Sequence, residues 1–404
     1  MRTSTVFNRL LNLQGGYVRD VQFADGRSLV VTLQRRARKH RCPHCSYATT
    51  SYYDHTHTSW RHVSLGAWRV TVRAFLVRIT CPTHGVTTES VPWAEHDSRF
   101  TRDFEDLVAW VAREMNATAV TRLLHIAWRT VGSIVERVVQ RKLDPERLHR
   151  LYRIGVDEVS YRKGHKYLTV VADHVTGEPV WIEDGRTQET LGKFFDELGL
   201  EWTGGLEAVT MDMCAPYIAA VRQRAPQAEI AFDPFHVVKL ANEAVQQVRR
   251  EEARSIKGTP EAQALKGSRW TLLKAPENLR EHEQAKLAEV AALNTRVYRA
   301  YLLKEELRTL YMCGTSAAEK HLDAWAAWAS RSRLQPFVRL ARTLRQYREG
   351  VLAAIRMGLS NGRLEGINNK ISVLKHRAYG FHSPAALIAM IFLCCCKLDI
   401  KLPI

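Results

Sequence analysis

The sequence of 404 residues is too long for one small hydrophobic core, and its 46% hydrophobic content fits roughly two to four globular domains. Lys and Arg number 59 against 42 Asp and Glu, and the formal charge is +17 at pH 7. The first 150 residues are the more basic part, with 23 bases and 13 acids. This balance favours a polyanionic partner, with nucleic acid first, over a basic surface that serves only solubility.

Membrane insertion and secretion are not expected. The first residues lack the pattern of a signal peptide, and the apolar segment 384–398 is shorter than the roughly 20 residues of a membrane span. We therefore expect a cytoplasmic protein with a buried C-terminal helix. Eight cysteines in a reducing compartment indicate metal ligation or burial rather than disulfides.

The N-terminal part predicts strands and a zinc site. Residues 16–35 read as two strands joined by the turn ADG. The pairs Cys42 with Cys45 and Cys81 with His84 are each interrupted by Pro and flanked by strands, which is typical of knuckles that converge on tetrahedral zinc. The 35 residues between the pairs exceed the usual roughly 15 to 20, so chance spacing is the alternative and His84 is the weakest ligand. Spare histidines are His44, His55, His57 and His62.

Residues 101–142 predict three short helices, because apolar side chains recur at spacings of three and four. The tight connection IAWRT precedes the last helix, for which Thr130 is the expected N-cap. Arg129, Arg137 and Arg141 lie on that helix, as in a helix-turn-helix that enters the major groove. A plain three-helix bundle is the alternative, which the basic charge makes second.

From residue 151 the pattern changes to three strands, a helix, a strand, a helix and a strand, ending near residue 236. The first three strands should pair antiparallel as a meander. Residues 237–350 then carry Ala, Leu, Glu and Arg at helical spacing, which predicts a helical block.

Two acids fall at strand positions that the topology should bring together. Asp157 lies in the first strand of this region and Asp212 ends the fourth. If those strands pair in parallel after a right-handed crossover, the two carboxylates become neighbours at the edge where ligands collect. Adjacent carboxylates repel unless a cation lies between them, and oxygen ligands select Mg²⁺ or Mn²⁺.

A third acid, Glu365, lies in a segment that otherwise carries amides, bases and apolar side chains. On a helix it would sit on a polar stripe beside the buried face, within reach of the end of the sheet. The alternative is a capping box, with Gly362 as N-cap and Glu365 at the third helical position. The same segment carries four cations suited to phosphates on either side of a scissile bond: Arg363, Lys370, Lys375 and Arg377.

The segments GVDEVS, TMDMCAPYIAAV, AFDPFHVVKLAN and SNGRLEGINNKISVLKHRAYGF resemble, in order and wording, the insertion-sequence DDE transposases of the ISL3 family. The resemblance covers nearly the whole chain. It implies a multidomain α/β protein with a ribonuclease-H-like mixed sheet. The implied ranges are 1–98 for a β and zinc-ribbon region, 99–150 for the helix-turn-helix, 151–236 and 351–404 for the catalytic core, and 237–350 for a helical insertion.

By that resemblance the catalytic triad is Asp157, Asp212 and Glu365, which would hold Mg²⁺ or Mn²⁺. Asp233 competes with Asp212 for the second place, but Asp233 and His236 look more like an accessory pair that supports the metal site or the DNA end. The second zinc pair departs from the simpler expectation of two cysteines, which leaves the fourth ligand open.

The implied activity is binding of terminal inverted repeats, hydrolytic nicking at the ends of the element and attack of a 3′-hydroxyl on target DNA. The partners would be double-stranded DNA and a second copy of the chain, because two ends must be brought together. Because its substrate would be DNA, we expect the protein to act on the bacterial nucleoid. The rivals are a DNA-binding regulator without catalysis and a ribonuclease-H-like structure-specific nuclease.

Overall fold

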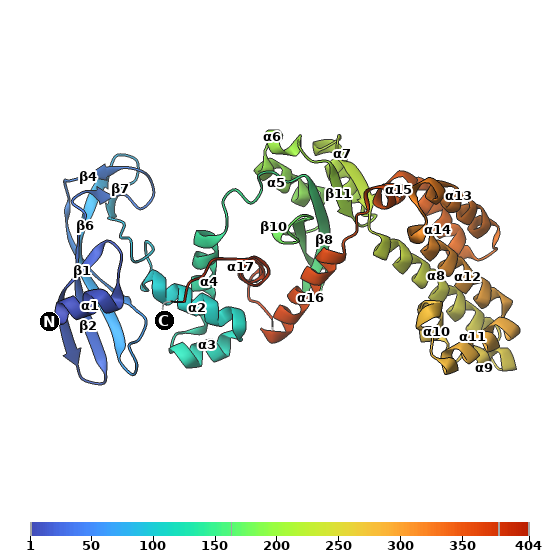
Figure 1. Ribbon diagram of the computed structural model, residues 1–404, viewed down its shortest axis with the longest axis horizontal. Helices are drawn as coiled ribbons and strands as arrows, with labels where there is room; N and C mark the ends of the chain where they lie inside the picture. The colour runs from blue at the N-terminus through green and yellow to red at the C-terminus, as the bar shows by residue number, and fades with distance from the viewer. Residues whose placement is uncertain (1, 163, 379, 403–404) are drawn as a thin grey trace. The chain divides into compact units, whose positions relative to one another are not determined.

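The computed structural model describes residues 2–162, 164–378 and 380–402, apart from the side chains of residues 260 and 261 (Figure 1). It separates into two compact units. Unit 1 consists of Met1–Asp144 together with Leu374–Ile404, and unit 2 of Pro145–Val373. The C-terminal segment thus packs with the unit in which the chain begins, whereas the sequence predicted 351–404 as one part of the catalytic core.

Unit 1 begins with a twisted sheet whose strand order is β1-β2-β6-β5, with β7 on the end of β6. β1 and β2 form the predicted antiparallel hairpin, while β2 and β6 pair in parallel. Alternate side chains of β2 and β6 are buried together with Trp60, because successive residues of a strand point to opposite faces. The elements are α1 (Thr3–Leu11), β1 (Gly16–Ala24), β2 (Ser28–Arg35), β3 (His40–Arg41), β4 (Ala48–Thr49), β5 (Asp54–Arg61), β6 (Arg69–Cys81) and β7 (Gly85–Thr88).

The three predicted helices follow as α2 (Arg102–Glu114), α3 (Ala117–Leu124) and α4 (Trp128–Lys142). Side-chain oxygens of Thr101 and Asn116 accept backbone N–H groups at the starts of α2 and α3. The prediction of Thr130 as the cap of α4 is wrong. His125 adopts a left-handed conformation that turns the chain, so helical geometry begins earlier, at Trp128, after an Ala127 without a side-chain cap.

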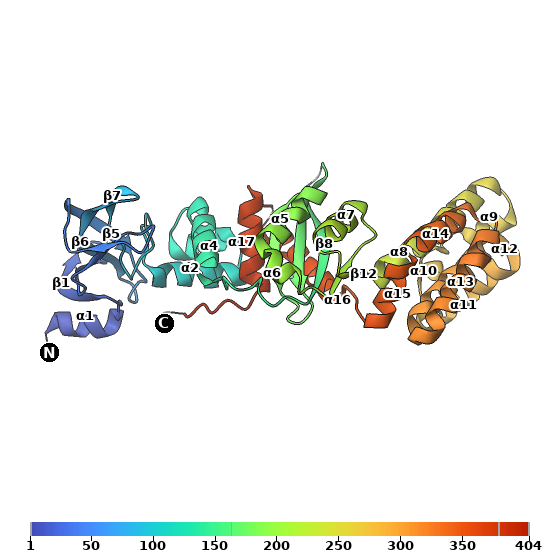
Figure 2. The ribbon, with the colours of Figure 1, turned by 90° about the horizontal axis from the view of Figure 1, so that it is seen from above.

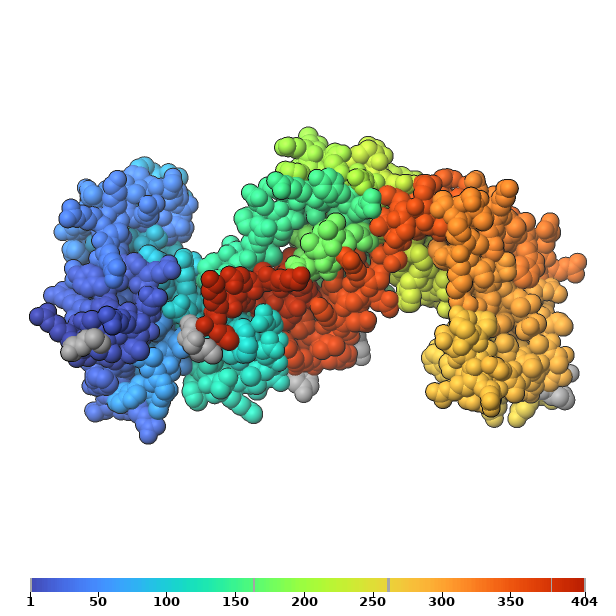
Figure 3. Space-filling model, in the orientation of Figure 1, coloured from blue at the N-terminus to red at the C-terminus, as the bar shows by residue number. Residues whose placement is uncertain are grey.

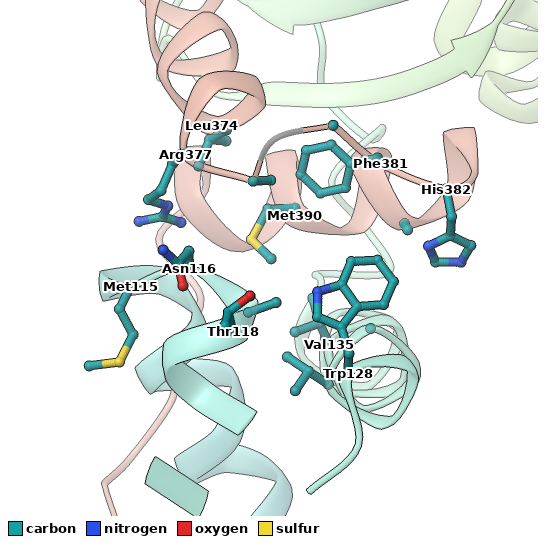
Figure 4. A pocket seen from close by; sticks show the side chains of 16 residues that line it. Met115, Asn116, Thr118, Trp128, Val135, Leu374, Arg377, Phe381, His382 and Met390 are labelled. Carbon is teal, nitrogen blue, oxygen red and sulfur yellow. The ribbon is translucent and has the colours of Figure 1, made fainter. Parts of the chain in front are cut away.

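The predicted buried C-terminal helix is confirmed as α17 (Pro384–Cys395), which lies against α4 within unit 1 (Figure 3). A cavity of about 60 Å³ remains between the C-terminal segment and the helices. Figure 4 shows that Trp128 and Val135 face it from α4 and Met390 from α17. In the described part of the chain, no helix is both long enough and apolar enough to span a membrane.

Unit 2 holds a five-stranded mixed sheet in the order β10-β9-β8-β11-β12. The predicted antiparallel meander is confirmed for β8, β9 and β10, and β8, β11 and β12 run parallel. Helices flank this sheet (Figure 2). The elements are β8 (Arg153–Arg162), β9 (Lys166–Asp173), β10 (Pro179–Asp184), α5 (Gln188–Leu198), α6 (Leu200–Thr203), β11 (Ala208–Met211), α7 (Ala215–Arg224) and β12 (Glu229–Phe232).

The predicted helical block then follows, and no strand occurs among its described residues. Trp325 and Phe337 are buried in its core, and the ammonium of buried Lys304 donates to the carbonyls of Leu272 and Lys274 at 3.0 Å each. The elements are α8 (Pro234–Ser255), α9 (Pro260–Leu265), α10 (Arg269–Leu273), η1 (Pro276–Asn278), α11 (Glu281–Leu293), α12 (Thr295–Thr309), η2 (Leu310–Met312), α13 (Thr315–Arg331), α14 (Gln335–Gln346) and α15 (Arg348–Met357).

The chain returns to the sheet through α15, which packs on β12, and then forms α16 (Gly362–Arg377). Leu364 of α16 packs directly on Gly155 of β8, where an added Cβ would lie 2.5 Å from its Cδ1 atom. A small residue in β8 therefore lets α16 approach the strand that carries Asp157.

Replacing Gly350 of α15 by alanine should destabilise unit 2. The new Cβ would lie 2.4 Å from the ring of Phe232 and 3.1 Å from the backbone oxygen of Ile230, so β12 or the helix must shift. We expect Gly350→Ala to lower the free energy of unfolding in urea by about 1–3 kcal/mol. Gly366→Ala is the matched control, because nothing lies within 4 Å of its Cβ and alanine favours the helix by about 0.5–1 kcal/mol. Equal effects of the two substitutions would contradict the packing of α15 on β12.

Candidate active site

Three side chains meet at the carboxyl end of the parallel strands of unit 2. Metal-ligating atoms of Asp157, Asp212 and His236 all lie within 4.8 Å of one another. The register pairs Thr210 of β11 with Gly155 of β8, which brings Asp212, just after β11, level with Asp157. His236 joins them because α8 begins directly after β12. The predicted pairing of the first and fourth strands is therefore confirmed.

The electrostatics of this cluster are unfavourable without a cation. Burial, followed by the charge of Asp212, raises the pKa of Asp157 to about 6. Burial alone would lower the pKa of His236, but a 2.8 Å contact between its Nδ1 and Asp212 Oδ2 and the charges of Asp157 and Asp233 raise it. The imidazole is thus the one base in a cluster with two carboxylates.

Asn368 of α16 completes the cluster. Its Nδ2 donates to Asp157 Oδ2 at 2.6 Å. Its own Oδ1 and the Oδ1 of Asp212 are buried and have no hydrogen-bond partner among the described residues. Buried oxygens without a partner are costly, and carboxylate and amide oxygens are the ligands that hard divalent cations accept. The residues present therefore fit a divalent metal ion.

Glu365 lies on α16 one turn before Asn368, and its side chain is exposed. It is not among the atoms that meet within 4.8 Å. In the described chain its carboxylate has no hydrogen-bond or ion-pair partner, and its backbone N–H donates to Asn361 O at 2.9 Å. Because α16 already begins at Gly362, Glu365 is its fourth residue, and the capping box considered above is not formed.

Asp233 has a different role from Asp157 and Asp212. It is 3% exposed, and its Oδ1 accepts the backbone N–H of Asn361 at 3.0 Å. The side chain of Asn361 in turn accepts the hydroxyl of Thr210, which also lies 2.6 Å from His174 Nε2. Asp233 thus anchors the start of α16. The sequence singled out Asp233 through AFDPFH, but nothing in that motif indicated Asn361, 128 residues away.

A cavity of about 230 Å³ opens beside the cluster. Asp157 and Asp212 line it together with Arg186, Cys214 and Tyr217. Arg186 lies over the ring of Tyr167 and pairs with Glu158 at 3.4 Å. These two contacts hold the guanidinium of Arg186 at the cavity. The cavity therefore combines an acidic edge with a basic residue.

A second cluster lies in unit 1 and brings together Cys42, Cys45, Cys81 and His84. Cys45 Sγ lies 3.6 Å from Cys81 Sγ, and His84 Nδ1 lies 3.7 and 3.5 Å from the sulfurs of Cys42 and Cys81. Ligands about 2.3 Å from a tetrahedral zinc ion lie about 3.7 Å from one another. The geometry is compatible with zinc, and His84 occupies the fourth corner.

Two cysteines of this second cluster, Cys42 and Cys81, accept hydrogen bonds at their sulfur atoms. Desolvation opposes ionisation of Cys81, but hydrogen bonds from His84 and from the backbone N–H groups of His84 and Thr83 lower its pKa to about 6. The backbone N–H of His44 donates to Cys42 Sγ at 3.4 Å. A thiolate is the form that binds metal, so both contacts favour ligation.

Some of the basic residues predicted to contact DNA form ion pairs within the protein, and others are exposed. Arg137 and Arg141 of α4 pair with buried Glu105 of α2, at 2.6 and 3.2 Å, so their charges hold the helices together. Arg129 is exposed at the start of α4. In α16, Lys370 is exposed.

Two further arginines are tied to backbone carbonyls. Arg363 donates to the carbonyls of His174 and Val175 at 2.6 and 2.7 Å, and Arg377 to those of Arg113 and Ala112 at 2.7 and 3.1 Å. Both therefore have a structural role at the ends of α16. Lys375 also has interactions within the protein.

Two adjacent aspartates on neighbouring parallel strands, one buried and one half-buried, in a basic chain with a helix-turn-helix pattern define an enzyme class that acts on DNA with divalent metal ions. The family model described as "Transposase" for ISL3 DDE transposases matches residues 154–391. The model for the helix-turn-helix domain of transposase family ISL3 matches residues 89–139. The chain belongs to the ISL3 family of transposases, as the motif resemblance predicted.

Named relatives agree over nearly the full length. The transposase for insertion sequence element IS1557 of Mycobacterium tuberculosis is 40% identical, over 97% of this chain and 96% of the relative. The transposase for insertion sequence element IS1001 of Bordetella parapertussis is 29% identical, over 91% of this chain and 92% of the relative. The protein is a mixed α/β DDE-type transposase with a DNA-binding helix-turn-helix domain.

The strain at Asp157 should be visible in the pH dependence of stability. Folding raises the pKa of Asp157 from 3.8 to about 6. The free energy of unfolding should therefore fall as the pH rises from about 4 to 6, and it should stay at the lower value above that range. In buffer free of Mg²⁺ and Mn²⁺, Asp157→Asn should therefore raise the free energy of unfolding by roughly 2 kcal/mol at pH 7.5. This gain should shrink as the pH falls toward 4. If Asp157→Asn were less stable than the parent at both pH values, the charged Asp157 carboxylate would not destabilise the fold.

Proposed function

We propose that this transposase binds the terminal inverted repeats of its insertion sequence, cleaves DNA strands at the ends of the element and joins the 3′-hydroxyl to target DNA. The observation that carries the proposal is the pairing of buried Asp157 with half-buried Asp212, which has a buried, unpaired Oδ1 beside Asn368. A non-catalytic regulator has no need for such a costly arrangement.

The proposed metal ligands are Asp157, Asp212 and Glu365, with Mg²⁺ or Mn²⁺ as the ion. Support for Glu365 comes from α16, where Asn368 already contacts Asp157 and Glu365 lies on the same side one turn earlier. We propose that the exposed carboxylate of Glu365 would join Asp157 and Asp212 as a third ligand when metal and DNA are bound. When bound, divalent ions lower the pKa of the attacking hydroxyl and stabilise the leaving oxygen of the phosphodiester.

The chain's own side chains prepare this chemistry. His236 holds Asp212 in one orientation, and Asn368 holds Asp157, so both carboxylates present their free oxygens to one place. Asp233 fixes the start of α16 and thereby the height of Glu365 above the sheet. Arg186 lines the adjoining cavity, where it can attract a phosphate. No covalent bond between protein and DNA is needed.

We also propose the finer architecture that the resemblance implied. The strand order β10-β9-β8-β11-β12, with the acids on β8 and after β11, supports a ribonuclease-H-like core formed by residues 151–236 and by the part of the predicted range 351–404 that belongs to unit 2, up to Val373, interrupted by the insertion 237–350. The sulfur and nitrogen distances around Cys42 support a zinc ribbon within 1–98.

For DNA recognition we propose that residues 1–98 and the helix-turn-helix region, within 99–150, contact the element ends, with Arg129 in the major groove. Arg363, Lys370, Lys375 and Arg377 would lie along phosphates near the cleaved bond. Pairing of two ends calls for at least a dimer acting on the bacterial nucleoid.

Loss of any of the three acids should separate binding from catalysis. Asp157→Asn, Asp212→Asn and Glu365→Gln should each reduce Mg²⁺-dependent cleavage of the element's own ends by roughly 10³-fold or more, with binding nearly unchanged. Glu349→Gln, which removes an exposed acid of α15, is the control and should cleave normally. Cleavage would be mapped on each strand in a gel assay.

The same assay separates the rivals. Binding without cleavage in either Mg²⁺ or Mn²⁺ by the wild-type protein would favour the regulator. Cleavage without joining to target DNA would favour a structure-specific nuclease. Normal cleavage by Glu365→Gln would exclude Glu365 from the triad.

Asn368 should contribute directly to metal affinity. Its amide both fixes Asp157 and offers an unpaired oxygen, so Asn368→Leu should weaken Mn²⁺ binding by about 10-fold in calorimetric titration. Asn368→Asp supplies a carboxylate in its place and should bind Mn²⁺ at least as tightly as the wild type. Asn369→Leu alters the exposed neighbouring amide and should have no effect. Unchanged affinity in Asn368→Leu would show that Asn368 does not serve the metal.

A further inference from the structure

The outer face of the N-terminal sheet exposes an aromatic side chain at its centre. β6 lies between β2 and β5, and its residues Ala74 and Leu76 point inward and are buried. Phe75 points to the opposite face and is 59% exposed. A large apolar side chain in the middle of an open sheet face is informative because a fold does not require it there.

Further rings line the same face. His57 of β5 is directly opposite Phe75 in the register, and their ring centroids lie 4.0 Å apart. His55, two residues earlier on β5, lies 4.6 Å from the ring of Tyr52, which is 55% exposed. We call these four residues, Tyr52, His55, His57 and Phe75, the aromatic strip.

The loop that carries Cys42 and Tyr47 covers this face only at the end of β6 beyond Phe75, and it leaves the aromatic strip bare. Val77 is the next outward residue of β6 after Phe75, and it is 7% exposed because it packs with Cys42 and Tyr47. The cover therefore ends between Val77 and Phe75. The aromatic strip begins where the loop stops.

The charge of this face is complementary to phosphate. Arg69 and Arg73 point outward from β6 and are exposed, and within the described residues neither makes an ion pair. Asp20 shares the face through its register with Thr32, and its carboxylate accepts a hydrogen bond from Gln22 at 2.8 Å. Exposed arginines beside exposed rings are the combination that binds single-stranded nucleic acid.

We propose that the aromatic strip binds an unpaired DNA strand, with bases stacked on Phe75 and His57 and phosphates held by Arg69 and Arg73. A duplex hides the faces of its bases, so stacking selects a strand that is unpaired. The inference rests on the proposed function, because cleavage at an element end can expose such a strand. It gives the N-terminal region a ligand distinct from the duplex repeats.

The test measures binding of the full-length protein to fluorescent oligonucleotides of one length, single-stranded dT and random-sequence duplex, by anisotropy. Phe75→Ala should weaken single-strand binding by about 10-fold and leave duplex binding unchanged, while Phe75→Trp should retain it. Phe23→Ala is the matched control, since Phe23 belongs to the same sheet and is 62% exposed but contacts Phe7 and Trp68 instead.

A second readout locates the contact. An oligonucleotide carrying 5-iodouracil should crosslink to Phe75 under ultraviolet light, and mass spectrometry should identify the modified peptide. Arg73→Gln should lower the slope of log affinity for the single strand against log salt concentration by about one. Equal loss of single-strand and duplex binding in Phe75→Ala, or no loss at all, would overturn the proposal. Cleavage of duplex ends, measured in parallel, tests the proposed function separately, because it does not depend on dT binding.

Discussion

The central constraint on this protein is the repulsion between two carboxylates that the sheet forces together. Asp157 and Asp212 are adjacent because β8 and β11 pair in parallel above a buried core. The raised pKa of Asp157, about 6, is the direct consequence of burial and of Asp212. His236 Nδ1 contacts Asp212 Oδ2 at 2.8 Å. The arrangement makes physical sense in a site that receives a divalent cation, as the DDE transposase family uses.

Helix α16 is the element on which this site depends most. Its start is fixed by the Asp233 contact to Asn361 and by Leu364 on Gly155. Its other end belongs to the first compact unit, where Arg377 donates to carbonyls at the end of α2. Asn368, which contacts Asp157, lies in the part of α16 that belongs to unit 2.

The positive charge of the chain is divided between structure and binding. Arg137 and Arg141 surround Glu105, which is fully buried, so these ion pairs maintain the packing of α2 on α4 and add little to the outer field. Arg129, Lys370 and Arg73 remain exposed. Net charge alone counts all of these residues equally. These three exposed cations lie on α4, α16 and β6.

The sequence by itself determined the elements, the metal-ligand spacing and the family, because these depend on local periodicity, on short motifs and on the rule that parallel strands end at one edge. It thus predicted that Asp157 and Asp212 meet. It did not predict the hydrogen bond of Asn368 to Asp157, 211 residues apart, or the partner of Asp233. Only the tertiary structure decided these contacts, and the exposure of Phe75, because they depend on which surfaces distant segments cover. The start of α4 was missed for a related reason: the left-handed His125, and not the capping preference of Thr130, sets where that helix begins.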